Sequence, residues 1–235
     1  MIEPALYLIP VPLSDKTRPA EVLPQSVLDI VTNLRYFAVE NVRSARRFIK
    51  SVDNGADISS MHFDVLDEHT APADVPAMLE PLRQGCPIGV ISEAGCPGVA
   101  DPGAMLVEVA RLENLDVRPL IGPSSILLGL MTSGFNGQNF AFSGYLPIES
   151  QARKRRLRQM TDRIRSERQT QIFIETPYRN NKLIAELAAT LPSDIRLCVA
   201  CELTAPTQEV KLMPLGKWRN TSYDFSKRPA IFLLA

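Results

Sequence analysis

The segment from Val90 to Gly103 carries the residue types best suited to hold a ligand. It begins as a buried strand at Val90-Ile91 and ends as a helix start at Asp101-Pro102, because aspartate caps helices and proline suits their first position. Between these elements, Gly95 and Gly98 lack side chains and allow a ligand to approach the backbone closely. Open α/β sheets bind ligands in loops that follow their parallel strands. The sequence therefore predicts a ligand-binding loop here, with a plain surface loop as the alternative.

Three glutamates lie where predicted strands end, so their side chains could reach a ligand at the edge of a sheet. They are Glu40, Glu175 and Glu202. A carboxylate in such a place can serve as the general base that a hydroxyl nucleophile needs. The alternative is a structural ion pair, Glu40 with Arg43 or Glu175 with Arg179, and the sequence alone leaves both interpretations open.

The composition argues against several classes of protein. The 235 residues carry 26 basic and 26 acidic side chains, so a formal net charge of zero offers no bulk attraction to nucleic acid. No Gly-x-Gly-x-x-Gly motif, phosphate-binding lysine loop or zinc-ligand spacing occurs. No apolar run approaches the ~18 residues of a membrane helix, and no signal peptide is recognisable. We therefore expect a cytoplasmic protein that contacts no membrane.

The pair Cys198-x-x-Cys201 invites a metal or redox interpretation. It lies in an apolar run, 195–201, that predicts a strand. Residues three apart on a strand point to opposite faces, so the two thiols should not share a ligand. We predict that both cysteines are structural and that the protein binds no metal.

Strand and helix signals alternate through the first half of the chain. Predicted strands lie at 5–9, 36–39, 88–91 and near 117, and predicted helices at 27–34, 44–50, 75–82, after 102 and at 123–131. This alternation is typical of a parallel sheet covered by helices on both faces. The run Ser133–Gly137 then breaks the pattern and is a candidate hinge.

Beyond the hinge the predicted strands lie closer together. They fall at 140–142, 171–174, 195–201, 207–213 and 230–234, with helices from Arg153 and from Thr176 onward. Such spacing favours a mixed sheet. We expect an α/β protein of two α/β domains, 1–134 with a parallel sheet and 135–235 with a mixed sheet.

The segment Arg153–Arg168 concentrates positive charge. It holds eight arginine and lysine side chains against Asp162 and Glu167, in a chain whose formal charge is zero. Such asymmetry can mark a surface that binds phosphates, and a solvated helix face is the alternative. No aromatic residue is interleaved with these charges, so base stacking is not predicted there.

Several segments, in order along the chain, match the motifs of a known family. They are Leu6–Leu13, Glu40–Arg43, Val90–Gly103, Ile121–Ser125, Ser133–Phe135, Phe142–Pro147, Phe173–Arg179 and Ala200–Thr204. Together they resemble the tetrapyrrole methylase superfamily, in particular its branch of ribosomal small-subunit RNA 2′-O-methyltransferases of type I. The resemblance implies two α/β domains with a ligand cleft between them.

The sequence departs from the family pattern at several positions. Ser14-Asp15 stand where the family has Gly-Asn, and Asn41-Val42 replace Asp-Thr. Glu93 replaces an aspartate, and Cys96 replaces a threonine. The RNA enzymes of the family usually carry a further C-terminal segment that has no counterpart before the last residue, Ala235.

The resemblance implies S-adenosylmethionine as the cofactor. Residues implied to contact it are Leu13, Ser92, Cys96, Val99, Ser124, Ser125, Thr176, Glu202 and Pro229. Those implied to take part in catalysis are Glu40, Arg43 and Glu175. Helix capping is the alternative role for each serine and threonine.

The function implied by the resemblance is 2′-O-methylation of ribose in ribosomal RNA. The sulfonium of the cofactor is already activated, so this chemistry needs positioning and a base but no metal. The family implies a homodimer, and ribosomal RNA could contact the Arg153–Arg168 segment. A small-molecule, tetrapyrrole-like methyltransferase and a non-catalytic cofactor-binding protein remain as alternatives.

Overall fold

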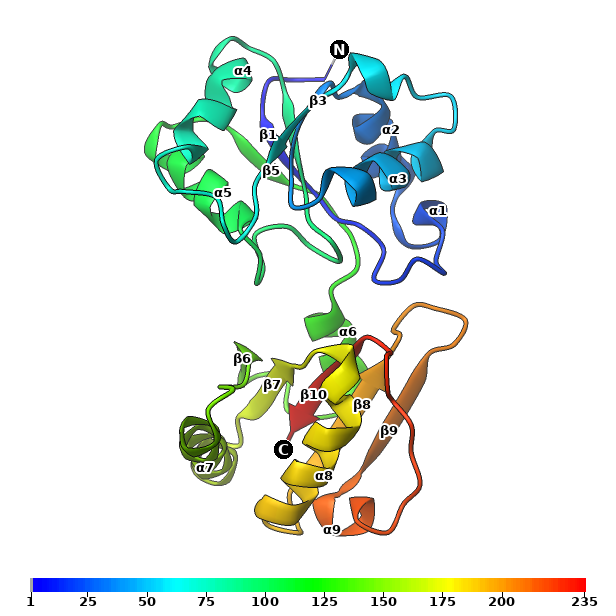
Figure 1. The fold of residues 1–235 in the computed structure, drawn as a ribbon, viewed down its shortest axis with the longest axis vertical. Coiled ribbons are helices and arrows are strands. Elements are labelled where there is room, and N and C mark those ends of the chain that lie inside the picture. Colours follow the sequence, from blue (N-terminus) through cyan, green and yellow to red (C-terminus); the bar gives the residue numbers. More distant parts are fainter. Residues whose placement is uncertain (1) are drawn as a thin grey trace. The chain divides into compact units, whose positions relative to one another are not determined.

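A computed structural model describes residues 2–235. The chain forms two compact units, and the division falls between Ser124 and Ser125 (Figure 1). The sequence placed this boundary ten residues later, after the helix that the structure defines as α6 (Ser125–Ser133). That helix belongs to the second unit because Gly129 allows it to approach the second sheet: a Cβ on Gly129 would lie 2.8 Å from Ile231 Cγ2. The break therefore precedes α6 instead of falling in the predicted hinge at Ser133–Gly137.

The first unit is built on a parallel sheet, as predicted. Its strands are β1 (Leu6–Ile9), β2 (Tyr36–Val39), β3 (His62–Val65), β4 (Ile88–Ile91) and β5 (Val117–Pro119). They follow the order β3-β2-β4-β1-β5, and every neighbouring pair is parallel. The carboxyl ends of all five strands therefore meet at one edge of the sheet.

Helices cover both faces of this parallel sheet. They are α1 (Pro19–Val22), α2 (Gln25–Asn33), α3 (Val42–Val52), α4 (Glu80–Arg83) and α5 (Gly103–Leu112). The first three helices pack on the strand residues that include Ile9 and Phe37, whereas α4 and α5 pack on the face that includes Leu6 and Val90 (Figure 1). The helix predicted over 75–82 is instead a 3-10 turn (Val75–Leu79) followed by α4.

The second unit contains a mixed sheet, also as predicted. Its strands are β6 (Phe140–Tyr145), β7 (Thr170–Ile174), β8 (Arg196–Cys201), β9 (Glu209–Pro214) and β10 (Ala230–Leu234). They follow the order β6-β7-β10-β8-β9. The β6–β7 pair is parallel and the other three pairs are antiparallel.

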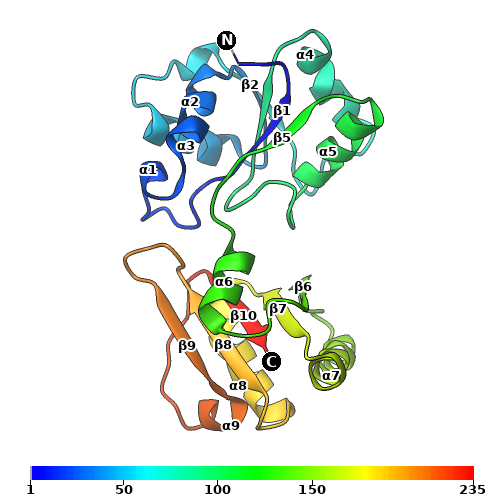
Figure 2. The same ribbon diagram turned by 180° about the vertical axis from the view of Figure 1, so that it is seen from behind.

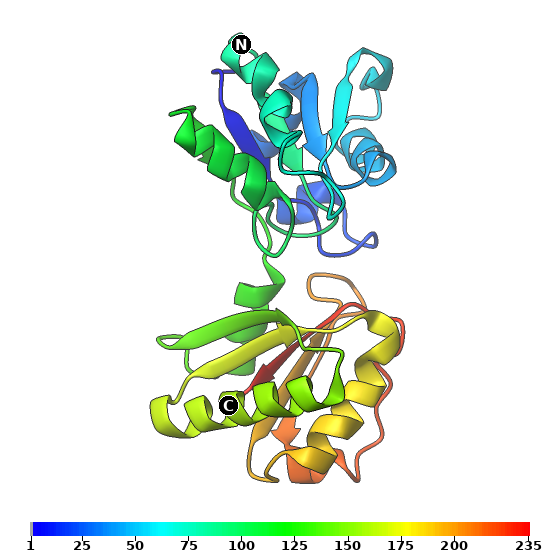
Figure 3. The same cartoon turned by 60° about the vertical axis from the view of Figure 1, so that its left-hand side comes forward.

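Four helices complete the second unit: α6, α7 (Ser150–Glu167), α8 (Asn180–Thr190) and α9 (Leu215–Trp218). Helix α6 lies on one face of the sheet, against Ile231 and Leu233 (Figure 2). Helices α7 and α8 lie together on the other face and bury Phe232 and Leu234 (Figure 3). A short 3-10 turn (Pro177–Arg179) links β7 to α8, where the sequence predicted that the helix itself would begin.

Both cysteines of the Cys198-x-x-Cys201 pair are buried in β8. Cys201 packs with Leu197 and Val199 in the core beneath α7 and α8. Cys198 differs from it by three residues and therefore points to the opposite face of the sheet, as predicted. Burial raises the pKa of the Cys198 thiol to about 12, so it stays protonated.

No helix within residues 2–235 is long and apolar enough to span a membrane.

The contact between α6 and β10 gives a test of the domain boundary. Gly129→Leu places a large side chain against Ile231, and we expect it to lower the unfolding free energy of the second unit by about 1–3 kcal/mol. Trp218 is the single tryptophan and is buried in that unit, so its fluorescence during urea unfolding reports this change. Thr132→Leu, on an exposed position of the same helix, is the matched control. Equal stability of the two variants would contradict the assignment of α6 to the second unit.

Candidate functional site

The sequence-predicted residues of the first unit gather at the carboxyl edge of its parallel sheet. Leu13 follows β1, Glu40 follows β2, and Ser124 follows β5. The loop after β4 supplies the others, Ser92, Cys96 and Val99. Parallel pairing brings these loops side by side, as expected for a ligand site in an open α/β sheet.

Two backbone hydrogen bonds fix the loop after β4 against the loop after β1. The Val11 amide donates to the Gly95 carbonyl at 2.9 Å, and the Gly95 amide donates to the Val11 carbonyl at 3.2 Å. Gly95 has a φ of +75°, a conformation that favours glycine. A Cβ there would lie 3.3 Å from Leu13 Cδ2 and 3.5 Å from the Pro123 carbonyl oxygen. Gly95 is therefore held between the loops that follow β1 and β5.

Asp101 holds the other end of this loop. Its Oδ1 accepts hydrogen bonds from the amides of Gly98, at 2.9 Å, and Gly103, at 2.7 Å. Helix α5 begins at Gly103, one residue later than a cap at Asp101 itself would place it. The Asp101 carboxylate nevertheless accepts a hydrogen bond from the first amide of the helix, so Asp101 stabilises the helix start as predicted.

The Cys96 thiol donates to the Pro123 carbonyl at 3.4 Å. Burial is the main reason that its pKa is raised, and the nearby Asp101 carboxylate adds to the effect. A protonated thiol is a poor nucleophile. Cys96 therefore braces the loop after β4 against the segment after β5.

Two cavities open beside this loop. One, of about 600 Å³, is lined by residues that include Val11, Ser92 and Arg47. The other, of about 390 Å³, is lined by residues that include Cys96 and Val99. Ser92, Cys96 and Val99 thus border two hollows, both within the usual range of small-molecule sites, whereas Leu13 and Ser124 line neither.

Ser92 stands out within the larger cavity. Its hydroxyl oxygen is buried and has no hydrogen-bond partner within residues 2–235. Buried polar atoms are normally satisfied, and an exception calls for an explanation. Because Ser92 lines a cavity at a sheet edge, a ligand atom that reaches its buried hydroxyl is the partner that explains it best.

Glu40 does not line this cavity but lies close to Ser92. Together with Ser92 and Asp101 it lines a small recess, and its Oε2 accepts a hydrogen bond from the Glu93 amide at 3.1 Å. The pKa of Glu40 is raised, chiefly by burial and further by the carboxylates of Glu93, Asp101 and Glu68. The predicted alternative, an ion pair with Arg43, is not formed among residues 2–235. A carboxylate of raised pKa is a better proton acceptor.

Arg43 lies in the first turn of α3, on an exposed position. Asn41 caps that helix, because its Oδ1 accepts hydrogen bonds from the amides of Arg43, at 2.9 Å, and Ser44, at 3.2 Å. Asn41 therefore caps the helix as the aspartate of the resembled motif would. The Arg43 guanidinium has no ion pair within residues 2–235 and is free to meet an anion.

The sequence-predicted residues of the second unit also converge at one edge of their sheet. Glu175 and Thr176 follow β7, Glu202 follows β8, and Pro229 precedes β10. Antiparallel pairing of β10 with both neighbours brings these three strand ends together. The Glu202 amide donates to the Pro229 carbonyl at 2.8 Å. Ser125 belongs to the second unit as the first residue of α6.

One oxygen of the Glu175 carboxylate, Oε1, is engaged within its own turn. It accepts hydrogen bonds from the Thr176 amide, at 2.7 Å, and from Arg179 Nε and Nη2, at 2.9 and 2.6 Å. Only 5% of the Glu175 side chain is exposed. The ion pair between Glu175 and Arg179, which the sequence left as an alternative, is therefore present. It gives Glu175 a structural role in stabilising the turn.

Glu202 is tied to a residue that the sequence did not single out. Arg228 Nε donates to Glu202 Oε2 at 2.9 Å, and Arg228 Nη1 donates to Glu209 Oε2 at 2.7 Å. These bonds hold the pKa of Arg228 above its usual range. Glu202 and Thr204 both have positive φ, 47° and 70°. Non-glycine residues in this conformation are strained, and such strain clusters at ligand sites.

No protein-family model matches the chain. Several curated proteins do, all named ribosomal RNA small subunit methyltransferase I. The protein of Vibrio cholerae is 28% identical over 214 residues, which cover 91% of this chain and 70% of the relative. That of Mesorhizobium japonicum is 31% identical over 214 residues, covering 89% and 67%, and that of Micromonospora olivasterospora is 31% identical over 204 residues, covering 87% and 61%. The chain thus spans about two thirds of their length.

Solved structures resemble the fold at much lower identity. The methyltransferase CobJ aligns with a TM-score of 0.65 at 14% identity, covering 98% of this chain and 93% of that one. Uroporphyrin-III C-methyltransferase from Thermus thermophilus, complexed with S-adenosylhomocysteine, aligns with a TM-score of 0.56 at 14% identity, covering 98% and 97%. These likenesses establish the two-domain α/β fold.

The raised pKa of Glu40 predicts a specific dependence of stability on pH. The native state holds this proton more tightly than the unfolded chain, so the charged carboxylate destabilises the fold above its native pKa. That penalty disappears as the pH falls toward the unfolded value, about 4.3. We expect Glu40→Gln to be more stable than the wild type at pH 7.5 and to lose this advantage near pH 4.5, as measured by urea unfolding. Glu108→Gln, at an exposed position on α5, is the control. An advantage of Glu40→Gln that is the same at both pH values would refute the assignment.

Proposed function

Because the chain belongs to the ribosomal RNA small subunit methyltransferase I family, we propose that it transfers a methyl group from S-adenosylmethionine to ribosomal RNA of the small subunit. The acceptor that we propose is a ribose 2′-hydroxyl. The observation that carries the proposal is the unpartnered, buried hydroxyl of Ser92, a residue that lines a cavity beside the glycine loop that matches the family motif.

The residues of the first sheet edge fit such a cofactor. Gly95 and Gly98 both have positive φ, 75° and 80°, and no side chain blocks approach to their backbone. The hydroxyl of Ser92 lacks a partner within residues 2–235, and the adjoining cavity of about 600 Å³ is large enough for a small molecule. These features support binding of S-adenosylmethionine at this edge.

When bound, S-adenosylmethionine supplies a methyl group on a sulfonium centre that leaves as a neutral thioether. The remaining work for the protein is to orient the acceptor hydroxyl and to accept its proton. Glu40 is the residue suited to the second task, because burial raises its pKa and its Oε1 accepts no hydrogen bond within residues 2–235. The exposed guanidinium of Arg43 suits the first task, since it can bind a phosphate next to the acceptor ribose.

Two substitutions separate binding from chemistry. Ser92→Ala removes a hydroxyl that bonds the ligand, so we expect S-adenosylhomocysteine to bind about five- to tenfold more weakly in calorimetry. Glu40→Gln removes the base, so transfer of a labelled methyl group to small-subunit ribosomal RNA should slow by about a hundredfold or more.

Ser51→Ala is the matched control for the first substitution. Ser51 lines the same cavity, but its hydroxyl already donates to the Phe48 carbonyl at 2.6 Å. If this control and Ser92→Ala weaken binding equally, Ser92 has no special role. If the wild type neither binds the cofactor nor methylates the RNA, the proposed function is wrong.

We further propose that α7 contacts the RNA backbone. Arg153 is paired with Glu186 at 3.0 Å, and Arg156 donates to Ser143 Oγ at 2.8 Å. Other basic side chains of the segment are exposed and have no ion pair within the described chain: Lys154, Arg155, Arg158, Arg163 and Arg168. The charge of the segment is therefore only partly neutralised by the protein.

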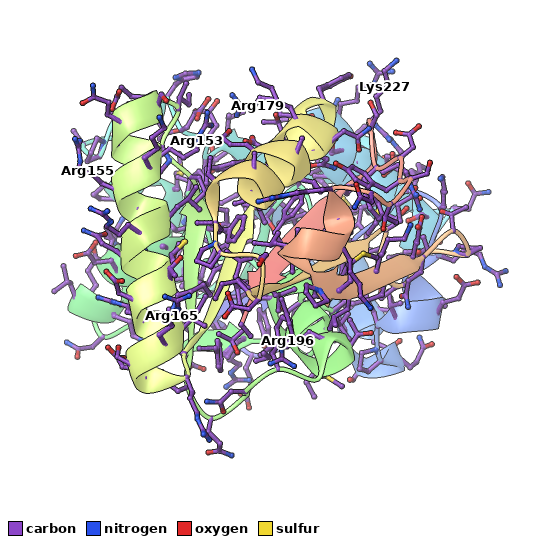
Figure 4. All side chains as sticks on the ribbon, turned by 90° about the horizontal axis from the view of Figure 1, so that it is seen from below. Arg153, Arg155, Arg165, Arg179, Arg196 and Lys227 are labelled. Carbon is purple, nitrogen blue, oxygen red and sulfur yellow. The ribbon has the colours of Figure 1, made fainter. Side chains whose placement is uncertain are left out.

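Several of these basic side chains line a groove beside α7. It has a volume of about 660 Å³ and runs between α7 and the end of α8, with Lys154, Arg155, Arg158 and Arg165 in its lining. Arg155 and Arg165 lie along this helix in Figure 4. A groove lined by cations is suited to a phosphate backbone.

The variant Arg155→Ala/Arg158→Ala tests this contact. We expect it to bind small-subunit ribosomal RNA about tenfold more weakly and to show a shallower dependence of affinity on salt, because fewer counterions are released. The control Lys50→Ala/Lys217→Ala removes two charges from exposed positions on α3 and α9. Identical salt dependence of the two variants would show that α7 is only solvated surface.

A ribosomal RNA substrate also supports a cytoplasmic location. The family resemblance supports a homodimer, and sedimentation of the purified protein tests that state.

A further inference from the structure

Tyr178 is the most exposed aromatic side chain within residues 2–235, at 77%. It lies in the 3-10 turn that follows β7, between Pro177 and Arg179. An apolar ring in water is common in mobile loops and needs no explanation there. The turn around Tyr178 is, in contrast, unusually well fixed.

Several independent contacts immobilise this turn. The buried Glu175 carboxylate accepts hydrogen bonds from the Thr176 amide and from the Arg179 side chain, on either side of Tyr178. Pro177 restricts φ directly before it. The Pro177 carbonyl accepts a hydrogen bond from the Lys227 amide at 3.0 Å.

The loop that carries Lys227 is itself fastened to the start of α8. Asn180 Nδ2 donates to the carbonyls of Phe225, at 3.0 Å, and Arg228, at 2.8 Å. Asn181 Oδ1 accepts from the Phe225 amide at 2.9 Å. Lys227 has a φ of +60°, a strained conformation for a residue with a side chain. The turn and the loop therefore form one rigid support for an exposed ring.

The charges around the ring are mainly positive. Lys182 is exposed in the first turn of α8, four residues after Tyr178. Arg179 and the exposed Lys227 both lie along the upper edge of Figure 4. The nearby acid, Asp224, is engaged by Asn181 Nδ2 and by the Ser226 amide, each at 2.9 Å.

We propose that Tyr178 is a platform on which an unpaired base of the RNA acceptor stacks, while Lys182 and Lys227 contact the flanking phosphates. A rigid aromatic face bordered by cations is how proteins commonly hold single-stranded RNA. The inference rests on the proposed function, because it concerns the RNA that is to be methylated. It supplies the aromatic contact that the α7 segment lacks.

The test compares Tyr178→Ala with Tyr178→Phe in the full chain. The probe is a fluorescein-labelled single-stranded RNA of about twelve nucleotides and mixed sequence, and its affinity is measured by anisotropy at several salt concentrations. Loss of one stacked base should weaken binding roughly tenfold to a hundredfold in Tyr178→Ala, with an unchanged salt slope. Tyr178→Phe keeps the ring and should bind within about twofold of the wild type. Lys182→Ala/Lys227→Ala should instead make the salt slope shallower.

The outcomes separate this inference from the proposed function. Calorimetry with S-adenosylhomocysteine should give the same affinity for all of these variants, which shows that they fold. If the wild type binds the RNA and Tyr178→Ala binds it equally well, the platform is wrong and the methyltransferase proposal stands. If Tyr178→Phe binds as weakly as Tyr178→Ala, the hydroxyl rather than the ring makes the contact, and stacking is wrong. If the wild type neither binds nor methylates RNA, both proposals fail.

Discussion

The paired hydrogen bonds between Val11 and Gly95 are the constraint on which the first site depends. They form an isolated antiparallel bridge between the loops that follow the parallel strands β1 and β4, so the glycine loop leaves the sheet at a fixed place. Only with the loop so held does Ser92 stay buried without a partner and Glu40 stay partly desolvated beside Glu93. Binding groups positioned before the ligand arrives need no costly rearrangement when it binds, which is the main requirement for methyl transfer.

The two sheet edges use their carboxylates in different ways. At the second edge, Glu175 and Glu202 are buried, but each forms an ion pair with an arginine. The arginines compensate the two negative charges, and the pairs stabilise the local backbone. At the first edge, Glu40 has an amide donor but no cation, and burial raises its pKa. A partly buried carboxylate without a counter-ion is a costly arrangement that is common at sites of proton transfer. The electrostatics therefore favour Glu40 over Glu175 as the base.

Much of the fold could be predicted from the sequence. The strands Tyr36–Val39 and Ile88–Ile91 have the predicted bounds because short apolar runs between turn signals determine them locally. The domain boundary could not be predicted, since α6 packs on β10, which lies about a hundred residues later in the chain. The convergence of site residues at two sheet edges followed from strand ends, but their partners did not. The local pair of Glu175 with Arg179 was one of the alternatives that the sequence offered, but that Arg228 reaches both Glu202 and Glu209 depends on distances between strands that no local pattern encodes.

The central claim is that the loop after β4 holds the cofactor. Hydrogen exchange of the backbone amides, followed by mass spectrometry with and without saturating S-adenosylhomocysteine, tests it most directly. The account predicts that exchange of the segment 92–98 slows markedly on binding, while the strand Glu209–Pro214, at the outer edge of the second sheet, is unchanged. Binding that leaves exchange of 92–98 unaltered would contradict the account, because the ligand would then lie away from Ser92 and the glycines.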